Sequence, residues 1–312
     1  MWTTRLALRF RSTAPVALGA VSAGALYAAA QCQAAEPAPV GLNPKAWTPL
    51  TLTKITPLSA NSAVYRFAFE DPEATSGMTV ASMLMTKAAI GSEKADGTRA
   101  NVIRPYTPIS RPDEKGYLEL AVKSYPDGKM SKHIASLRVG DKLDFKGPVV
   151  KLPYKPNNHS HIGMVAGGTG IAPMLQVLDE VLDNPADKTQ VSLIFANVSE
   201  HDILLKRQLD AREALYPDRV SIYYVVDKAP VRAVGEPAWQ GGVGYVTAAM
   251  LRSKLPPPSD LSMVYVCGPP PMYKAICGAK ATKETPDDPK KQGELSGFLK
   301  ELGYTSDNVF KF

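Results

Sequence analysis

The chain has 312 residues, of which 45% are hydrophobic and 21% are charged, and its formal net charge is +6. This length and apolar content suffice for two ordinary domains with buried cores. The small basic surplus fits cofactor phosphates or an acidic partner, and it is too small to indicate nucleic-acid binding. The cysteines are Cys32, Cys267 and Cys277, without a CxxC pair, so neither a disulfide framework nor a zinc site is indicated.

The N-terminal stretch differs in composition from the rest. Residues 1–11 are arginine-rich, and the first acidic residue is Glu36; such starts are typical of mitochondrial targeting signals. Residues 14–30 are small, apolar and uncharged, at the lower limit for a membrane span. A secretory signal, a cleaved mitochondrial presequence and a retained single-pass anchor all fit, and the cysteine pattern disfavours secretion. We expect a mitochondrial leader whose anchor is cut from part of the population, with a linker to residue 46.

From residue 47 the pattern is typical of short strands separated by turns. Several alternating segments at this spacing predict an antiparallel barrel or sandwich. The expected strands are 50–56, 63–69, 116–125 and one ending at Phe145, and a single helix is expected over 131–137.

After Pro156 strands alternate with helices, which predicts a parallel sheet covered on both faces. The expected strands are 162–166, 191–196, 221–226 and 262–267, and the expected helices are 174–182, 204–215, 247–251 and 272–279. Ligands of open α/β sheets bind beyond the carboxyl ends of the strands. The first strand-to-helix turn of this region is therefore the expected ligand site.

That turn is Gly167-Gly168-Thr169-Gly170-Ile171-Ala172-Pro173-Met174. Its backbone N–H groups and the positive helix end suit a phosphate or an electron-rich ring. Glycine turns between strands and helices also serve simple packing, so this stretch alone leaves both interpretations open.

Two stretches of the β-rich region carry similar chemistry. Arg104-Pro105-Tyr106-Thr107-Pro108-Ile109-Ser110 combines a cation that can grip a pyrophosphate with an aromatic ring and a hydroxyl that suit a flat heterocycle. An edge strand with a surface arginine and a core tyrosine fits the same residues. Gly128-Lys129-Met130-Ser131 lies at a predicted helix start, where free amides form an anion site. An ordinary serine N-cap is the alternative there.

Cys267-Gly268-Pro269-Pro270-Pro271-Met272 ends the last strand of the α/β region. Its rigid turn places Cys267 at the carboxyl edge of the sheet, on the same rim as Gly167–Gly170. A lone cysteine is often only a small core residue, so this stretch also needs its neighbours to indicate a site.

Together and in this order, the four motifs resemble the NADH–cytochrome b5 reductase family within the ferredoxin-reductase-like flavoenzymes. The resemblance covers residues 47–312, and the leader and the ending 303–312 are similar to those of the fungal mitochondrial form. It implies a β plus α/β fold: a six-stranded antiparallel Greek-key barrel that binds FAD over 47–154, then a Rossmann-like parallel-sheet domain that binds NADH over 155–312. Residues 1–46 are the leader, with the anchor at about 14–30.

The resemblance also implies roles for the matched residues. Thr107, Lys123 and Cys267 are expected to act in catalysis. The residues that it assigns to FAD are Arg104, Pro105, Tyr106, Thr107, Ala121, Lys123, Tyr125, Gly128, Lys129, Met130 and Ser131. Those that it assigns to the nicotinamide nucleotide are Gly167, Gly168, Thr169, Gly170, Ala172, Pro173, Asp227, Cys267, Gly268, Pro269 and Met272, with Phe310 or Phe312 closing the site.

Two of these residues carry a qualification. The resemblance places Asp227 near the adenine ribose, where a carboxylate accepts a hydrogen bond from a free 2′-hydroxyl and repels a 2′-phosphate. NADH should then be preferred over NADPH, although an exposed loop aspartate is the alternative. The family often has threonine where this chain has Ala172, so only a backbone contact is expected there.

The implied reaction is hydride transfer from NADH to FAD, then single electrons to cytochrome b5 or a similar acidic haem protein. Lys87, Lys129 and Lys132 are candidate docking cations. The implied location is the mitochondrial outer membrane, with a cleaved form in the intermembrane space. A related flavin reductase with another acceptor and a non-catalytic, membrane-tethered nucleotide-binding module are the alternatives. No metal is expected, because His159 and His161 lack neighbouring cysteines or an acid cluster.

Overall fold

The computed structural model describes residues 38–281 and 292–312. The first 37 residues of the predicted leader, including the predicted anchor at 14–30, lie outside these residues. The end of the predicted linker, residues 38–46, is described, and Leu42 is buried in the core of the first sheet. Within the described ranges, no helix is both long and apolar enough to cross a bilayer. Residues 38–312 belong to one structural unit, which contains two sheets.

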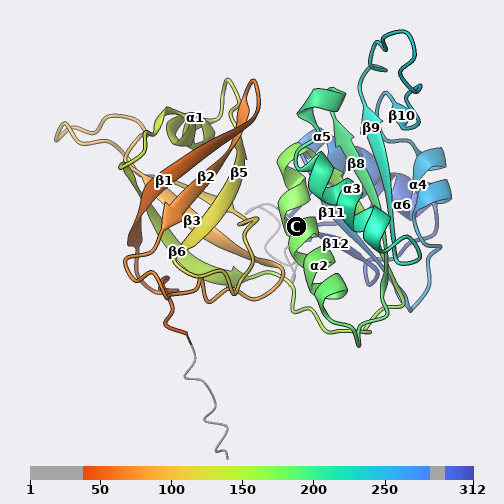
Figure 1. The fold of residues 1–312 in the computed structure, drawn as a ribbon, viewed down its shortest axis with the longest axis horizontal. Helices are drawn as coiled ribbons and strands as arrows, with labels where there is room; N and C mark the ends of the chain where they lie inside the picture. Colours follow the sequence, from red (N-terminus) through yellow and green to blue (C-terminus); the bar gives the residue numbers. More distant parts are fainter. Residues whose placement is uncertain (1–37, 282–291) are drawn as a thin grey trace, which may run out of the picture. The chain divides into compact units, whose positions relative to one another are not determined.

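The first sheet has six antiparallel strands in the order β4-β3-β6-β1-β2-β5 (Figure 1). Sequential strands pair as β1–β2 and β3–β4, whereas β6 returns to lie between β3 and β1. The strands are β1 Thr48–Ser59, β2 Ser62–Ala68, β3 Ser82–Ala88, β4 Val102–Tyr106, β5 Tyr117–Lys123 and β6 Lys142–Val150.

The segment after β4 closes this sheet into a barrel by binding β5. The amide of Ile109 donates to the carbonyl of Glu119 (2.8 Å), and the amide of Glu119 donates to Ser110 Oγ (3.0 Å). Alternate apolar residues of the strands fill the interior, as the period of a strand requires. Helix α1 (Lys129–Ser136) adds Met130 and Ile134 to the same core.

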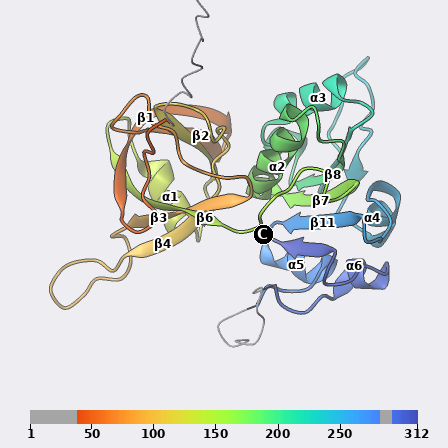
Figure 2. The same ribbon diagram turned by 90° about the horizontal axis from the view of Figure 1, so that it is seen from below.

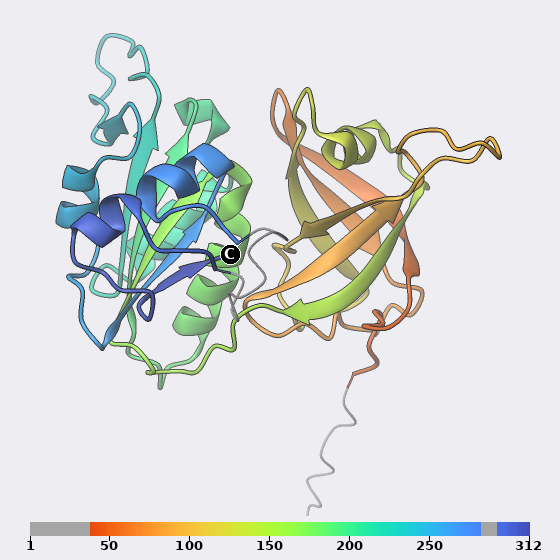
Figure 3. The same ribbon diagram turned by 180° about the vertical axis from the view of Figure 1, so that it is seen from behind.

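The second sheet has six parallel strands in the order β10-β9-β8-β7-β11-β12. Figure 2 shows α2 and α3 on one face of it and α4, α5 and α6 on the other, and Figure 3 turns the second face to the viewer. The strands are β7 His161–Gly167, β8 Gln190–Asn197, β9 Val220–Val226, β10 Gly242–Val243, β11 Ser262–Cys267 and β12 Val309–Lys311. The helices are η1 Gly168–Gly170, α2 Ile171–Asp183, η2 Glu200–Asp202, α3 Lys206–Leu215, α4 Ala248–Lys254, α5 Pro270–Ile276 and α6 Gly297–Glu301.

Strand alternation explains why this sheet carries helices on both faces. On β7, Met164 and Ala166 pack into the core that α2 and α3 cover, whereas Val165 packs into the core of α4, α5 and α6. All three side chains are fully buried. Apolar residues that point both ways are typical of parallel sheets.

The predicted succession of an antiparallel six-stranded sheet and a parallel α/β sheet is confirmed. Several bounds differ from the expectation. The first α/β helix begins at Ile171 rather than Met174, because Pro173 is compatible with a first helical turn. The final predicted helix is α5, which spans Pro270–Ile276 rather than 272–279. Strands β3, β10 and β12 and helix α6 had no counterpart among the predicted elements. Strand β4, at the edge of its sheet, includes Arg104–Tyr106, for which an edge strand was one of the two interpretations.

Candidate active site

The glycine turn and the cysteine turn interlock at the carboxyl edge of the parallel sheet. Strands β7 and β11 are neighbours, with Ala166 opposite Cys267. A Cβ atom on Gly170 would lie 2.0 Å from the Cys267 carbonyl oxygen, and one on Gly167 would lie 2.7 Å from Met272 Sδ. Such distances leave no room for a side chain. Gly170 thus brings the two motifs into backbone contact, and Gly167 packs against the Met272 side chain, as the shared rim predicted.

Gly168 faces a different environment from its neighbours. Its φ of +54° lies in the left-handed region that favours glycine. A Cβ there would have only the Tyr125 hydroxyl within 4 Å, at 3.7 Å. Gly168 therefore borders open space next to an aromatic residue of the barrel.

Tyr125 is one of three polar residues of the barrel part that influence one another. Burial raises the pKa of Tyr106 to about 12, with Arg104 opposing the shift and Tyr125 adding to it, so the three groups lie near one another. Arg104 is exposed and donates to the adjacent carbonyl of Ile103 (2.8 Å). No carboxylate of the described residues pairs with it. An unpaired arginine fork beside two phenols suits an anionic ligand with an aromatic part.

The start of α1 leaves backbone donors available. Gly128 is the N-cap and supplies no side chain to accept from the first turn. The Ser131 hydroxyl donates to the Gly128 carbonyl (3.2 Å) and accepts from the Tyr125 amide (3.4 Å). The serine therefore braces the turn, and the first-turn amides are the groups that a phosphate would meet.

Lys123, at the end of β5, reaches the α/β part of the chain. Its ammonium lies 2.9 Å from Asp202 Oδ1, and Ser199 Oγ donates to Asp202 Oδ2 (2.7 Å). Burial alone raises the pKa of Asp202, but the hydrogen bonds from Ser199 and Lys123 outweigh it, so the pKa lies below its ordinary value of 3.8. The lysine was predicted to line the cofactor; its carboxylate partner was not predicted.

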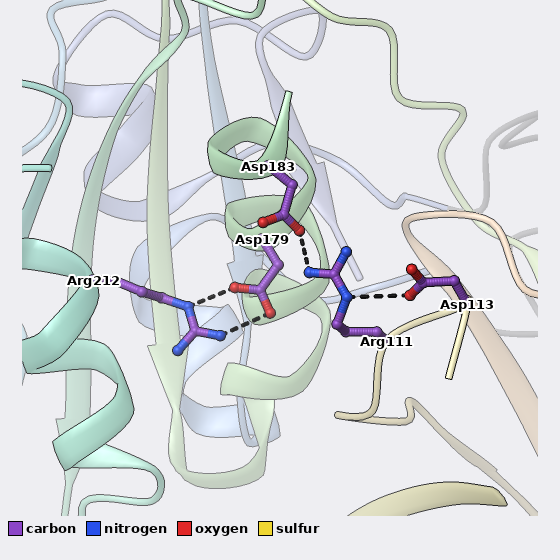
Figure 4. A network of polar contacts seen from close by, with 5 residues as sticks. All are labelled: Arg111, Asp113, Asp179, Asp183 and Arg212. Atoms are coloured by element: carbon purple, nitrogen blue, oxygen red, sulfur yellow. Dashed lines mark hydrogen bonds and ion pairs between the residues drawn. The ribbon is translucent and has the colours of Figure 1, made fainter. Parts of the chain in front are cut away.

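A second group of ion pairs lies around α2, and one of its members joins the same two parts of the chain (Figure 4). Arg111, in the turn after β4, pairs with both Asp113 and Asp183 of α2. One helix turn earlier, Asp179 binds the Arg212 fork of α3 through both oxygens (2.5 and 2.9 Å). The Arg111–Asp183 and Lys123–Asp202 pairs thus connect the barrel to α2 and the η2 turn, whereas Asp179–Arg212 holds α2 against α3.

The Cys267 thiol belongs to a polar cluster that reaches the C-terminus. Burial raises its pKa, and a hydrogen bond with Tyr273 and the charge of Lys280 oppose this only in part. The Tyr273 hydroxyl donates to the carbonyl oxygen of Phe312 (2.7 Å). A raised pKa keeps the thiol protonated at neutral pH, so Cys267 is not poised as a nucleophile.

Phe310 and Phe312 both lie beside the end of β11. The rings of Phe310 and Phe312 are 5.0 Å apart, and those of Tyr265 and Phe312 are 5.6 Å apart, both edge to face. The Phe312 amide also donates to the Val266 carbonyl (3.0 Å). The cluster places either phenylalanine within reach of the cysteine turn.

Asp227 follows β9 directly, at the same carboxyl edge. Its amide donates to the carbonyl of Val198 (3.2 Å), and its side chain is exposed. The remaining predicted residues differ in exposure. Thr107, Thr169 and Gly268 are half-buried, Pro105, Lys129 and Pro269 are exposed, and Ala121, Met130, Ala172 and Pro173 are buried.

The paired histidines lie elsewhere. His161 begins β7, at the opposite edge of the sheet from the glycine turn, and its Nε2 lies 2.8 Å from Ser192 Oγ. Together with His159 and Lys188 it lines an open cavity of about 560 Å³. Among the described residues, no cluster of histidine, cysteine or carboxylate side chains could hold a metal ion.

Comparison with known proteins covers both parts of the chain. A family model described as an oxidoreductase FAD-binding domain matches residues 49–154, and one described as an oxidoreductase NAD-binding domain matches residues 164–278. An NADH-cytochrome b5 reductase-like protein of Arabidopsis thaliana is 51% identical over 271 residues, which are 87% of this chain and 78% of that protein. NADH-cytochrome b5 reductase 2 of Emericella nidulans is 50% identical over 267 residues, 85% and 78% of the two chains.

Solved structures agree with this pattern. The cytochrome b5 reductase domain of Ulva prolifera nitrate reductase is 29% identical and superposes with a TM-score of 0.72, covering 88% of this chain and 100% of that domain. A ferredoxin NADP+ reductase of Neisseria gonorrhoeae shares the fold at 18% identity, with a TM-score of 0.60 and coverage of 85% and 98%.

Proposed function

The chain belongs to the family of NADH-cytochrome b5 reductases, and we propose that it carries electrons from NADH to cytochrome b5 or a similar acidic haem protein. It is an FAD-dependent oxidoreductase that uses NADH. The observation that carries the proposal is that about half of the aligned residues are identical to those of reductases of this name, over most of both chains.

The residues present fit FAD. Arg104 has no carboxylate partner in the described part of the chain, the first turn of α1 has uncapped amides, and Gly168 borders open space beside Tyr125. Arg104 would hold the pyrophosphate, and the amides of Lys129 to Ser131 would bind phosphate oxygens. Tyr106, Thr107 and Tyr125 would contact the ring system, with Ala121 and Lys123 beside it.

FAD, when bound, supplies the ability to take up a hydride and to release electrons singly. The residues of the chain contribute orientation and exclusion of water. Gly168 leaves the space that a planar ring needs, and the Tyr265, Phe310 and Phe312 cluster shields the edge beside Cys267. Cys267 remains a thiol and acts by packing and hydrogen bonding. This division fits hydride transfer, which depends on alignment more than on an acid–base pair.

An acidic haem protein would dock most readily on exposed cations near α1. Lys129 and Lys132 are exposed there. Lys87 is less available, because its ammonium pairs with Asp144 (3.0 Å) and lies 4.7 Å from the centre of the Trp47 ring. We therefore assign the docking role to the two lysines of α1. Exposed charges of this kind raise the association rate and make it sensitive to salt.

The proposed location is the mitochondrial outer membrane, with a cleaved form in the intermembrane space. The arginine-rich, acid-free start and the uncharged apolar stretch at 14–30 support it. Import of the full chain into isolated mitochondria, followed by carbonate extraction and protease treatment, tests this. A product in the soluble fraction outside mitochondria would contradict it.

A different one-electron acceptor is the second candidate, favoured by the likeness to a reductase domain of nitrate reductase. A non-catalytic nucleotide-binding module is the third. An absorption spectrum of the purified protein separates the reductases from the module. The reductases show flavin bands that NADH bleaches without oxygen, and a module shows no bleaching.

A further inference from the structure

The two chain segments that follow β8 and β9 meet just beyond the sheet. These strands are parallel neighbours, and the Asp227 amide binds the Val198 carbonyl just beyond their ends. The η2 turn begins two residues after Val198, with Glu200. Glu200 and Asp227 therefore lie on adjacent segments of the carboxyl edge, where nucleotides bind in such sheets.

Arg232, in the loop that begins at Asp227, forms an ion pair with Glu200. Its Nη1 lies 3.0 Å from Glu200 Oε2 and its Nη2 lies 3.2 Å from Glu200 Oε1. This is the bidentate contact that an arginine also makes with a phosphate group. The side chains are 28% and 24% exposed, so the pair is shielded from solvent more than a surface pair.

The pairing has a consequence for nucleotide selection. A 2′-phosphate on the adenine ribose is commonly bound by an arginine near this edge. Here both terminal nitrogens of the loop arginine already contact a carboxylate. Asp227 adds an exposed acid, and none of the described residues forms an ion pair with it. Lys228 is exposed beside Asp227 and balances one charge at most.

We propose that Glu200 is a specificity-determining residue, which keeps Arg232 occupied and so withholds it from the 2′-phosphate of NADPH. The proposal rests on the proposed function, since it concerns the nucleotide that this reductase uses. This withholding of Arg232 would disfavour NADPH in addition to the direct repulsion expected of Asp227. In this arrangement Glu200 acts through Arg232 and has no contact of its own with the nucleotide.

The test is calorimetric titration of the FAD-loaded protein with 2′,5′-ADP and with 5′-AMP, which differ only in the 2′-phosphate. Glu200→Gln keeps the size of the side chain and removes its charge. It should raise the affinity for 2′,5′-ADP by about ten-fold, the effect of one charge-assisted contact, and leave that for 5′-AMP within about two-fold. The ratio of kcat/KM for NADPH over NADH should rise in parallel.

Two further variants keep the result interpretable. The double variant Glu200→Gln, Arg232→Gln should lose the gain, because the released arginine is gone. Glu236→Gln removes a charge from the same loop. Glu236 is exposed and accepts a hydrogen bond from the Ala233 amide (3.1 Å). This variant should not reproduce the gain in affinity. An unchanged 2′,5′-ADP affinity in Glu200→Gln, or a gain that persists in the double variant, would overturn the proposal. A wild-type protein that binds neither NADH nor 5′-AMP would overturn the proposed function itself.

Discussion

Gly170 and Cys267 meet through the backbone: a Cβ on Gly170 would lie 2.0 Å from the Cys267 carbonyl oxygen. The φ of Gly170 is −61°, which any residue can adopt, so the need for glycine is purely steric. The contact fixes the nucleotide turn against the cysteine turn. It also means that a single methyl group should disturb both.

Gly170→Ala should therefore destabilise the protein by about 1–3 kcal/mol, the usual cost of overpacking a fixed backbone contact. It should also raise KM for NADH. Urea unfolding and steady-state kinetics measure the two effects. Gly163→Ala is the matched control, because its Cβ would meet only side chains, at 3.0 Å and beyond, and should cost less. Equal losses in the two variants would refute the special role of the Cys267 contact.

Asp202→Asn should weaken the link between the barrel and the α/β part at neutral pH. The change leaves Lys123, which is 11% exposed, without its counter-charge, at an expected cost of about 1.5–3 kcal/mol. Folding lowers the pKa of Asp202 below 3.8, so its stabilising effect is complete above that pH and is lost as the pH falls through the lower, folded value.

The difference in unfolding free energy between wild type and Asp202→Asn should consequently be largest near pH 7 and shrink below about pH 4. Urea titrations at several pH values measure it. Asp144→Asn, which removes a more exposed partner of Lys87 within the barrel, is the control and should cost less. A difference that grows on acidification would contradict the assignment.

Arg104→Ala should release FAD. The guanidinium has no carboxylate partner in the described part of the chain, and we assign it to the pyrophosphate. A charge-assisted bidentate contact of this kind contributes about 1.5–3 kcal/mol to binding. The ratio of flavin absorbance to protein absorbance after gel filtration measures retention. Arg138→Ala, an exposed arginine beyond α1, should retain FAD fully. Stoichiometric FAD in Arg104→Ala would remove Arg104 from the site.

Asp227→Ala should erode the preference for NADH over NADPH, because it removes an exposed negative charge next to the proposed ribose position. We expect the ratio of the two kcat/KM values to fall by roughly ten-fold. Asp218→Ala, an exposed aspartate before β9, is the control for general charge effects. An unchanged ratio in Asp227→Ala would exclude this residue from nucleotide selection.

The motifs were predictable from the sequence because each is local. Gly167–Gly170 and Cys267 end neighbouring parallel strands, and such ends share an edge. The partners of the motif residues were not predictable, because they are remote in the chain. Asp202 lies 79 residues from Lys123, Asp183 lies 72 residues from Arg111, and Arg232 lies 32 residues from Glu200. A charged residue in a loop carries no signal of the partner that tertiary packing brings to it.

Two short strands and the contacts of Lys87 and Ser131 were also not predictable from the sequence. Strands β10 and β12 span two and three residues, too short for an alternating pattern to stand out. Lys87 was a candidate docking cation, but Asp144 of the neighbouring strand β6 pairs with it, and the ring of Trp47, just before β1, lies beside its ammonium. Ser131 was assigned to FAD, and its hydroxyl is bonded within its own turn. A contact between elements decides the outcome for Lys87, and a hydrogen bond within the turn decides it for Ser131.

Reduction of purified cytochrome b5 by NADH in the presence of the FAD-loaded protein tests the central claim most directly. We expect the haem absorbance to change with saturation kinetics in both substrates, at a rate that falls with added salt and with Lys129→Glu or Lys132→Glu. NADPH should support the reaction far less well. A flavin that NADH bleaches while cytochrome b5 stays oxidised would contradict the proposed acceptor, and a protein whose flavin NADH does not bleach would contradict the account as a whole.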